Sequence, residues 1–342
     1  MTTASKTTGL GWLLLFAALA VFPLLPEPIG SKFHTELLSK VMILSIFAAS
    51  LQLLVGFTGL VSLGHAAFFG LGGYMVAMLA PPDGPGNGWL LLGAALAGAA
   101  ALSLLIGALV MRTKGIYFIM VTLAFTQLVF FVFHDTKIAG GSDGAYVYFK
   151  PEFTLGGVRL LDLDNSRTFF WFVLGALALT LGVLALLLRS RFGHALVGIQ
   201  HNEQRMRAAG YATLLYKLGS FVAGGTLAGL GGFLYAVQYG FVTPEILSWH
   251  HSGNALVMII LGGLGSLGGA VAGAFVFVLL GEGFQTLTKH WQLLLGGFVI
   301  LSVALLPQGL AGAIAQGRSR LARRRAPTAT EPAQDVTQGA QA

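Results

Sequence analysis

The chain has 342 residues, of which 55% are hydrophobic and 10% are charged, and its formal net charge is +7. Soluble domains carry about 25% charged residues, so this composition excludes a globular protein surrounded by water. The basic residues gather in short segments beside apolar runs, which is the positive-inside pattern of membrane proteins, so we expect no nucleic-acid partner. The chain contains no cysteine, which excludes disulfides and thiolate metal sites.

Apolar segments in chain order predict helices that cross a membrane, because a run of about 18 such residues spans a bilayer core about 30 Å thick. The segments are Leu10–Leu25, Val41–Val55, Ala66–Ala80, Trp89–Met111, Ile116–Phe133, Thr168–Leu188, Leu218–Tyr239, Ala255–Leu280 and Gln292–Leu306. Prolines close the first segment and no small-residue cleavage site follows it. We therefore interpret it as a retained helix rather than a removed signal peptide.

Two glycine-rich stretches, Gly56–Gly73 and Gly262–Gly273, are predicted to break the helices as re-entrant or discontinuous segments. Irregular backbone at membrane depth persists only inside the protein or along a wet cavity. The expected fold class is all-α, a polytopic integral membrane protein with about 8–10 transmembrane helices and glycine-broken segments.

Loop charges predict the orientation. Clusters of basic residues are expected on the cytoplasmic side, and they are Arg112 with Lys114, Arg189–Lys217, and Arg318–Arg325. The mixed-charge segment His134–Arg167 is expected outside. Placing the last two clusters on one side requires an extra chain reversal, which we predict at Gly262–Gly273. The orientation of the N-terminus stays open.

The expected division of the chain is a transmembrane domain over 1–316 and a basic, then disordered, cytoplasmic tail over 317–342. Gly59–Ala66 and Gly263–Ala270 share the pattern G-L-x-S-L-G-x-A. This pattern predicts a weak internal inverted repeat, with a first copy at about 36–135 and a second at about 215–312. Paired glycine-interrupted segments in two halves point to a transport path.

The residues expected to line such a path are Ser62, Gly64, His65, Phe68, Gly263 and Ser266. We predict that Gly56–Gly64 and Gly262–Gly269 face each other, since helix breaks free N–H and C=O groups that lipid cannot satisfy. The alternative is that these glycines only let helices pack closely. For His65, a structural role is the alternative to a proton relay.

No Asp or Glu lies within the apolar segments named above. Proton- or sodium-coupled carriers need buried ionisable residues, so their absence favours energy supplied by another chain. There is no phosphate-binding loop, catalytic constellation or metal-ligand cluster, and we expect no enzymatic activity, no metal and no cofactor. A stand-alone channel, a secondary carrier and a membrane enzyme are the alternatives.

The cytoplasmic loop over 190–217 is predicted to contain a short helix between two transmembrane segments. Asn202 suits the N-cap and Gly210 the helix stop. Phe192, Met206 and Tyr211 supply apolar side chains that a solvated linker would not need. This pattern favours docking onto a cytoplasmic partner, with a solvated linker as the alternative.

Several motifs between about Ser45 and Gly312 together resemble one family. They are Gly56–Tyr74 (GFTGLVSLGHAAFFGLGGY), Lys114–Phe118 with Val121–Phe125, Gly140–Gly144, Phe192–Gly210, Leu261–Ser266 and Leu306–Leu310. The chain resembles the permeases of branched-chain amino-acid ABC importers, and among their two paralogous subunits the larger, LivM-like one. It departs from the family at His194 and Val197, where Arg is common, and at Ala139, where Thr is usual.

This resemblance implies a bacterial inner-membrane permease that transports leucine, isoleucine and valine, although close relatives move urea, amides or other amino acids. The implied partners are a second, LivH-like permease, two ATP-binding subunits that hydrolyse ATP, an external amino-acid-binding protein and membrane lipid. The residues that the resemblance assigns to coupling with the ATPase are Asn202, Glu203, Ala208, Ala209 and Gly210.

Overall fold

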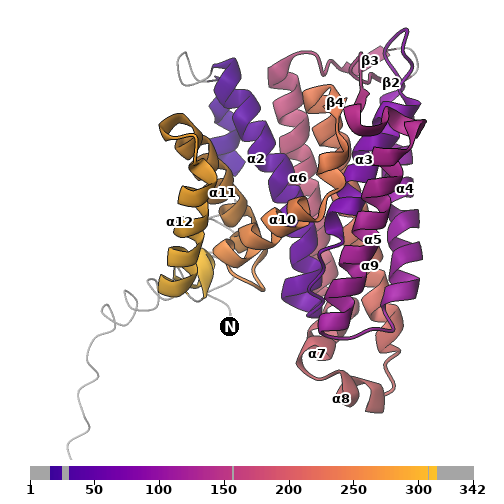
Figure 1. Cartoon of the computed structure of the whole chain (residues 1–342), viewed down its shortest axis with the longest axis vertical. Helices are drawn as coiled ribbons and strands as arrows, with labels where there is room; N and C mark the ends of the chain where they lie inside the picture. The colour runs from indigo at the N-terminus through magenta and orange to yellow at the C-terminus, as the bar shows by residue number, and fades with distance from the viewer. Residues whose placement is uncertain (1–15, 25–30, 156–157, 307, 314–342) are drawn as a thin grey trace, which may run out of the picture.

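The structure is a computed structural model, and it describes residues 16–24, 31–155, 158–306 and 308–313. Figure 1 shows a bundle of helices, most of them running along its long axis. The helices are α2 (Lys32–Gln52), α3 (His65–Leu79), α4 (Gly88–Val110), α5 (Ile116–Asp135), α6 (Ser166–Arg189), α7 (Arg191–His201), α8 (Glu203–Ala208), α9 (Thr213–Tyr239), α10 (Trp249–Gly262), α11 (Leu267–Leu287) and α12 (Trp291–Leu305). A π-helical segment, η2 (Leu53–Thr58), continues α2.

Short 3-10 turns and strands complete the described fold. The turns are η1 (Phe22–Leu24), η3 (Lys137–Ala139), η4 (Gly141–Asp143) and η5 (Pro244–Leu247). Strand β1 (Ala145–Tyr146) pairs antiparallel with β4 (Phe241–Val242), with Ala145 opposite Val242. Strands β2 (Phe153–Leu155) and β3 (Val158–Leu161) also pair antiparallel.

The prediction of an all-α polytopic membrane protein is confirmed. Seven helices among the described residues are long and apolar enough to cross a membrane, and the shorter α3 is also apolar. The first predicted segment, Leu10–Leu25, lies partly outside the described residues; within it, Phe16–Val21 is helical. The tail over 317–342, with its Arg318–Arg325 cluster, lies outside the described residues altogether.

Side-chain caps explain where several helices begin. Asn87 Oδ1 accepts hydrogen bonds from the backbone N–H groups of Trp89 and Leu90 at the start of α4. Asn165 Oδ1 accepts from Arg167 N at the start of α6. These bonds satisfy N–H groups that have no partner within the helix. A helix end is explained in the same way: α9 ends before Gly240, which has a left-handed φ of 64°.

The two ends of the bundle differ. Helices α7 and α8 lie at the lower end in Figure 1, and β2, β3 and β4 lie at the upper end. We call these the α8 end and the β2–β3 end. The loop between α4 and α5 reaches the α8 end, since Lys114 Nζ lies 3.8 Å from Glu203 Oε2. Two loops predicted to share one side of the membrane therefore meet.

The apolar segment Ala255–Leu280 is not one helix. It divides into α10 and α11, which are joined by residues 263–266. The backbone of Gly262 lies against that of Gly269, and Gly273 lies against Met258, so α11 runs back along α10. This confirms the chain reversal predicted at Gly262–Gly273. Glycine makes the hairpin possible because it lets the two backbones approach closely.

Two series of elements have the same order. Residues 32–58 and α9 are helices of 27 residues each. A segment without α-helix and then a short α-helix follow each of them, α3 with 15 residues and α10 with 14. The long helices run in opposite directions, since Gln238 near the end of α9 donates to the carbonyl of Glu36 near the start of α2.

Aligning the two series by the order of their elements gives a different match from aligning them by the shared glycine motif. The motif aligns the entrance of α3 with the entrance of α11, whereas the element order aligns α3 with α10. The glycine pattern therefore does not mark equivalent points of the two series. The inverted repeat at about 36–135 and 215–312 remains a prediction, now based on element order.

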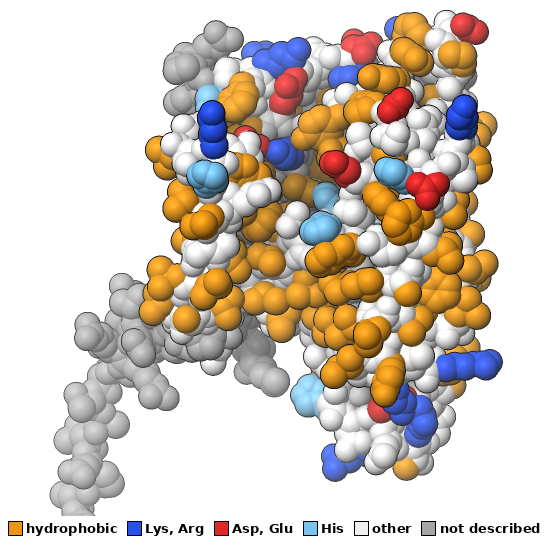
Figure 2. Space-filling view, viewed as in Figure 1, with side chains coloured by type: hydrophobic (Ala, Val, Ile, Leu, Met, Phe, Trp, Pro, Cys, Tyr) orange, Lys and Arg blue, Asp and Glu red, His pale blue; other side chains and the backbone are white. Residues whose placement is uncertain are grey.

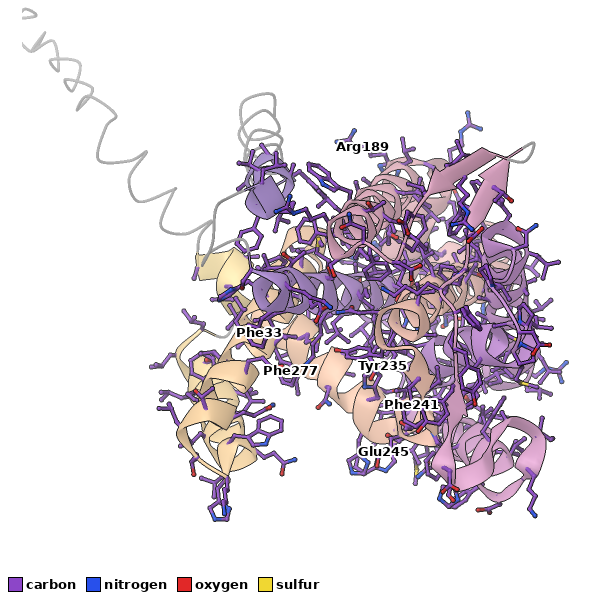
Figure 3. All side chains as sticks on the ribbon, turned by 90° about the horizontal axis from the view of Figure 1, so that it is seen from above. Phe33, Arg189, Tyr235, Phe241, Glu245 and Phe277 are labelled. Atoms are coloured by element: carbon purple, nitrogen blue, oxygen red, sulfur yellow. The ribbon has the colours of Figure 1, made fainter. Side chains whose placement is uncertain are left out.

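Packing separates the buried helices from the exposed ones. Helix α2 is buried along most of its length, and α3 packs closely on α9 where Gly72 contacts Gly229 and Gly73 contacts Gly232. Helices α5 and α12 leave most of their apolar side chains at least partly exposed. Seen from above in Figure 3, Glu245 lies on the open face between them, and Phe277 lies on the side of α11 and α12.

Candidate translocation and coupling sites

The two glycine breaks meet at one point, where Gly56 of η2 lies against Gly265. A Cβ atom on Gly56 would come within 2.8 Å of Gly265 N, so a larger residue there would collide with backbone. Gln52 Nε2 donates hydrogen bonds to the carbonyls of Gly263 (3.1 Å) and Ser266 (3.3 Å). We call this contact the glycine junction. Its side chains and freed carbonyls hold two interrupted helices together without a charged group.

The rest of the first break does not face the second. Gly59 lies against Gln200 of α7, and Gly64 lies against Thr122 of α5. Ser62 is buried, and its Oγ accepts a hydrogen bond from Gly64 N at 3.1 Å. Ser266 is partly exposed and caps α11, where its Oγ accepts from Gly269 N. Each serine thus accepts a local backbone hydrogen bond, Ser62 from two residues on and Ser266 from three residues on, and they do so at separate places.

His65 begins α3 deep in the protein. Its Nε2 lies 2.8 Å from Ser50 Oγ, and its ring stacks on that of Phe47 at a centroid distance of 5.5 Å. The ring of Phe47 also stacks on that of His251 from α10, at a centroid distance of 5.2 Å. The N-terminal ends of α3 and α10 meet here, because Ala66 N donates to Ser252 Oγ at 2.8 Å.

Most of the predicted path residues are packed in this structure. Ser62, His65 and Phe68 are fully buried, and Phe68 packs edge-to-face against Phe221. None of the six predicted path residues lines the pocket described next. The sequence therefore found a central, glycine-dependent region but not the open space beside it.

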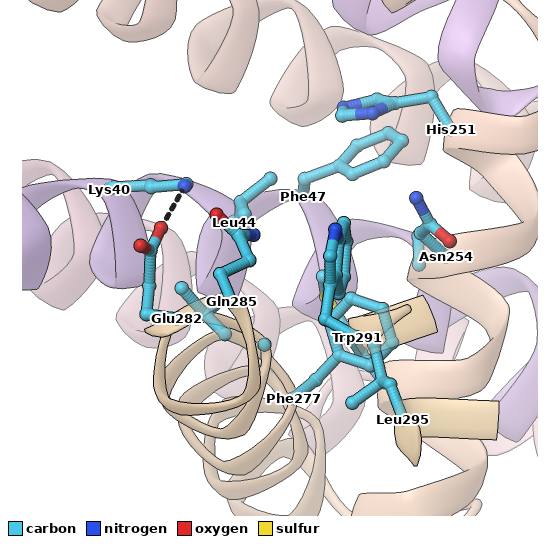
Figure 4. Close-up of a pocket in the computed structure, with 14 residues that line it drawn as sticks. Lys40, Leu44, Phe47, His251, Asn254, Phe277, Glu282, Gln285, Trp291 and Leu295 are labelled. Carbon is cyan, nitrogen blue, oxygen red and sulfur yellow. Dashed lines mark hydrogen bonds and ion pairs between the residues drawn. The ribbon is translucent and has the colours of Figure 1, made fainter. Parts of the chain in front are cut away.

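A pocket of about 160 Å³ lies on the other side of Phe47. Figure 4 shows its most polar feature, an ion pair in which Lys40 Nζ of α2 lies 2.6 Å from Glu282 Oε1 of α11. His251, Asn254, Gln285 and Trp291 also line the pocket. In Figure 2 the face beside α12 is hollowed, and charged and histidine side chains lie in the hollow.

The sequence analysis missed this pair because it started one apolar segment too late and ended another too early. Lys40 lies one residue before Val41–Val55, and Glu282 lies two residues after Ala255–Leu280. Helix α2 begins at Lys32 and α11 runs on to Leu287, so both charges are inside the helices. No Asp or Glu lies within the apolar segments as predicted, but the helices extend beyond those segments, and α11 contains Glu282. Opposite charges at the margins of two apolar segments were the available signal.

The predicted helix in the cytoplasmic loop is α8, and both its predicted N-cap and its predicted stop are present. Asn202 Oδ1 accepts a hydrogen bond from Arg205 N at 2.9 Å, as an N-cap does. Gly210 has a left-handed φ of 85°, and its N–H bonds to the carbonyl of Arg207. Ala208 and Ala209 are exposed, as are Gln204, Arg205 and Arg207, so α8 presents most of its surface at this end of the molecule.

Glu203 holds α8 in place. Its carboxylate accepts hydrogen bonds from Lys217 Nζ of α9 (2.6 Å) and from Arg207 Nη2 (2.6 Å), and it faces Lys114. Burial alone would raise the pKa of Glu203, but the hydrogen bonds and charges of Lys217, Arg207 and Lys114 lower that pKa to about 2. The carboxylate is thus ionised at every physiological pH and links three segments.

Helix α7 connects α8 to the glycine junction. Gly198 of α7 leaves room for the sulfur of Met206 from α8, which a Cβ would meet at 2.8 Å. Gln200 Nε2 of α7 donates to the carbonyl of Gly56 at 3.2 Å. Phe192 stacks on Tyr216 of α9 at 5.4 Å. A continuous series of contacts therefore runs from the exposed α8 to the point where the two breaks meet.

Helices broken by glycine, an ion pair within membrane-spanning helices and a short exposed helix at a basic end define a multi-pass membrane transport protein. The chain belongs to the family described as "Branched-chain amino acid transport system / permease component", which matches residues 34–304. It is a LivM-like permease, a multi-pass protein of the bacterial inner membrane.

Curated relatives agree with this family. The chain is 31% identical over 318 residues to the "High-affinity branched-chain amino acid transport system permease protein LivM" of Escherichia coli, covering 87% of this chain and 74% of that protein. Identity to the LivM protein of Salmonella typhimurium is 30% over 299 residues, or 82% and 70% of the two chains. The "Autoinducer 2 import system permease protein LsrC" of Photorhabdus laumondii is 29% identical over 144 residues, 40% of this chain and 43% of that protein. No solved structure matches.

Proposed function

We propose that the chain is the transmembrane permease subunit of an ATP-driven ABC importer and forms the translocation path for branched-chain amino acids. Similarity to two LivM permeases over most of their length supports the substrate class. ATP hydrolysis takes place on separate ATP-binding subunits. A second, LivH-like permease and an external amino-acid-binding protein complete the importer.

The observation that best supports an ATP-driven importer is the geometry of α8. It is a short, capped helix with an exposed surface, clamped to the bundle by Glu203 at the basic end of the molecule. Such a helix can pass a push from a docked ATPase to α7 and onward to the glycine junction. The α8 end is cytoplasmic in this proposal, following the positive-inside rule.

The path opens and closes at the glycine junction. In the closed arrangement Ser62, Gly64, His65 and Phe68 are packed inside the bundle. Movement of α7 would pull on Gly56 and separate it from Gly265, which exposes Gly263 and Ser266 with their polar backbone groups. Uncharged polar contacts suit a path that must release its solute quickly.

Purification of the chain from cells that also produce the ATP-binding and second permease subunits tests this function. An importer predicts co-isolation of the ATPases and uptake of leucine, isoleucine and valine that requires ATP. Replacing Glu203 with Arg should abolish uptake while the chain still inserts. Uptake without the ATPases would indicate a channel or secondary carrier. ATP-dependent uptake of urea or amides in place of the branched-chain amino acids would revise the substrate.

A further inference from the structure

We propose that the pocket at Lys40 and Glu282 binds a zwitterionic amino acid with an aliphatic side chain by exchanging partners with the ion pair. The ligand carboxylate takes the place of Glu282 on Lys40, and the ligand ammonium takes the place of Lys40 on Glu282. This inference rests on the proposed function and adds the place and the mode of recognition.

The first argument is the position of the charges. Lys40 and Glu282 lie within helices that cross the membrane, where charged groups are costly and mark solute paths. Their side chains are 33% and 29% exposed, so they are held in the wall of the pocket and still reach its interior. Helix α11 would pack on α2 without them, and apolar residues fasten helices at least as well as a buried pair does. Holding two helices together therefore does not account for the ion pair, and we expect it to have a further role.

The second argument is the shape and lining of the space. At about 160 Å³ the pocket is well below the roughly 300 Å³ at which sites for drug-sized ligands begin. It holds several times the roughly 30 Å³ of one liquid water, which suits a single small solute. Beyond the ion pair the pocket has polar side chains from His251, Asn254 and Gln285, and an apolar wall formed by Leu44, Met258, Phe277, Val278 and Leu295. One charge of each sign beside an apolar wall matches an amino acid with an aliphatic side chain.

The third argument is charge balance. A zwitterion has no net charge, so its entry leaves the net charge of the pocket unchanged and leaves both Lys40 and Glu282 paired. A ligand with one charge would pair with either Lys40 or Glu282 and leave the other half-buried charge unpaired, which is costly. The internal pair also competes with the ligand, which keeps binding weak and allows release. The pocket thus selects for the amino acid backbone as well as for the side chain.

Trp291 lines the pocket and reports on its occupancy. The experiment uses the purified importer complex without its external binding protein and follows tryptophan fluorescence during titration with L-leucine. We expect a saturable change that is lost when Trp291 is replaced by Phe. The double variant Lys40→Met with Glu282→Gln removes both charges together and should weaken leucine binding at least about tenfold.

A matched control lies two turns earlier in α2. Lys32 and Glu36 form an exposed ion pair, with Lys32 Nζ 3.8 Å from Glu36 Oε1, and neither residue lines the pocket. The double variant Lys32→Met with Glu36→Gln should bind leucine as the wild type does. Leucinamide, which lacks the carboxylate, and 4-methylpentanoate, which lacks the ammonium, should bind the wild type at least about thirtyfold more weakly, since unpairing a buried charge costs several tenfold factors in affinity.

The exchange variant Lys40→Glu with Glu282→Lys separates binding from structure and remains informative if the neutral variant does not fold. It restores an ion pair but reverses which helix carries each charge. Leucine binding that stays weak in a folded exchange variant supports the proposal. Wild-type affinity in either pair variant, equal binding of the singly charged analogues, or no Trp291 response in the wild type would overturn it. ATP-driven leucine uptake by the wild-type complex tests the proposed function separately, so the two can fail independently.

Discussion

Replacing Glu203 with Gln tests how α8 is held to the bundle. The amide keeps the size of the side chain but removes the charge that faces Lys217, Arg207 and Lys114. The side chains of Lys217 and Glu203 are only 11% and 19% exposed. Breaking a fully buried pair costs about 3–5 kcal/mol, whereas exposed pairs contribute about 0–1 kcal/mol. For this intermediate burial we expect a loss of about 2 kcal/mol in the free energy of unfolding.

The assay is a double-mutant cycle with Lys217→Met, in which unfolding of the purified permease is followed in mixed micelles. The coupling between Glu203 and Lys217 should exceed about 1 kcal/mol. Because the pKa of Glu203 is lowered from 4.5 to about 2, its stabilisation is present above about pH 4.5 and is lost as the pH falls toward 2. Glu36→Gln, at an exposed pair, serves as the control. Equal stability of Glu203→Gln and wild type at pH 7 would refute the reasoning.

Three further predictions concern packing, the path and orientation. Gly72→Ala should destabilise the protein by about 1–3 kcal/mol, because its Cβ would collide with the backbone of Gly229, whereas Gly93→Ala, with open space around it, should be neutral or slightly stabilising in a thermal unfolding assay. Gly64→Leu should give an assembled complex that hydrolyses ATP without transport; loss of folded protein instead would favour a packing role alone. Since the chain has no cysteine, single cysteines can be placed freely. A thiol reagent added outside intact cells should label a cysteine at Asp143 but not one at Arg205, and the reverse result would invert the orientation.

Much of the fold could be predicted because the bilayer simplifies the physics. Long apolar runs have one stable form in lipid, and most of the predicted segments are helices in the structure. Local signals were equally reliable where one residue determines a terminus. Asn202 and Gly210 were identified from their own chemistry, and each makes the bond expected of a cap or stop.

The pocket could not be predicted because it depends on a contact between residues far apart in the chain. Lys40 and Glu282 are separated by 242 positions, and a single sequence does not show which helix margins meet. The shared glycine motif was misleading for the same reason, since it aligned α3 with α11 on local similarity. Gly56 and Gly265 do meet, but the long-range register that brings them together also involves α7, whose Gln200 signalled nothing in the sequence.

The most direct test of the central claim is uptake of radiolabelled leucine into proteoliposomes that contain this chain, its second permease subunit and the ATP-binding subunits, with the external binding protein added. Leucine should accumulate only with ATP, and isoleucine and valine should compete with it. Replacing the ATP-binding subunits with variants that cannot hydrolyse ATP should stop the uptake. Leucine accumulation that continues in those variants, or a complete complex that hydrolyses ATP without moving any of the three amino acids, would contradict the account.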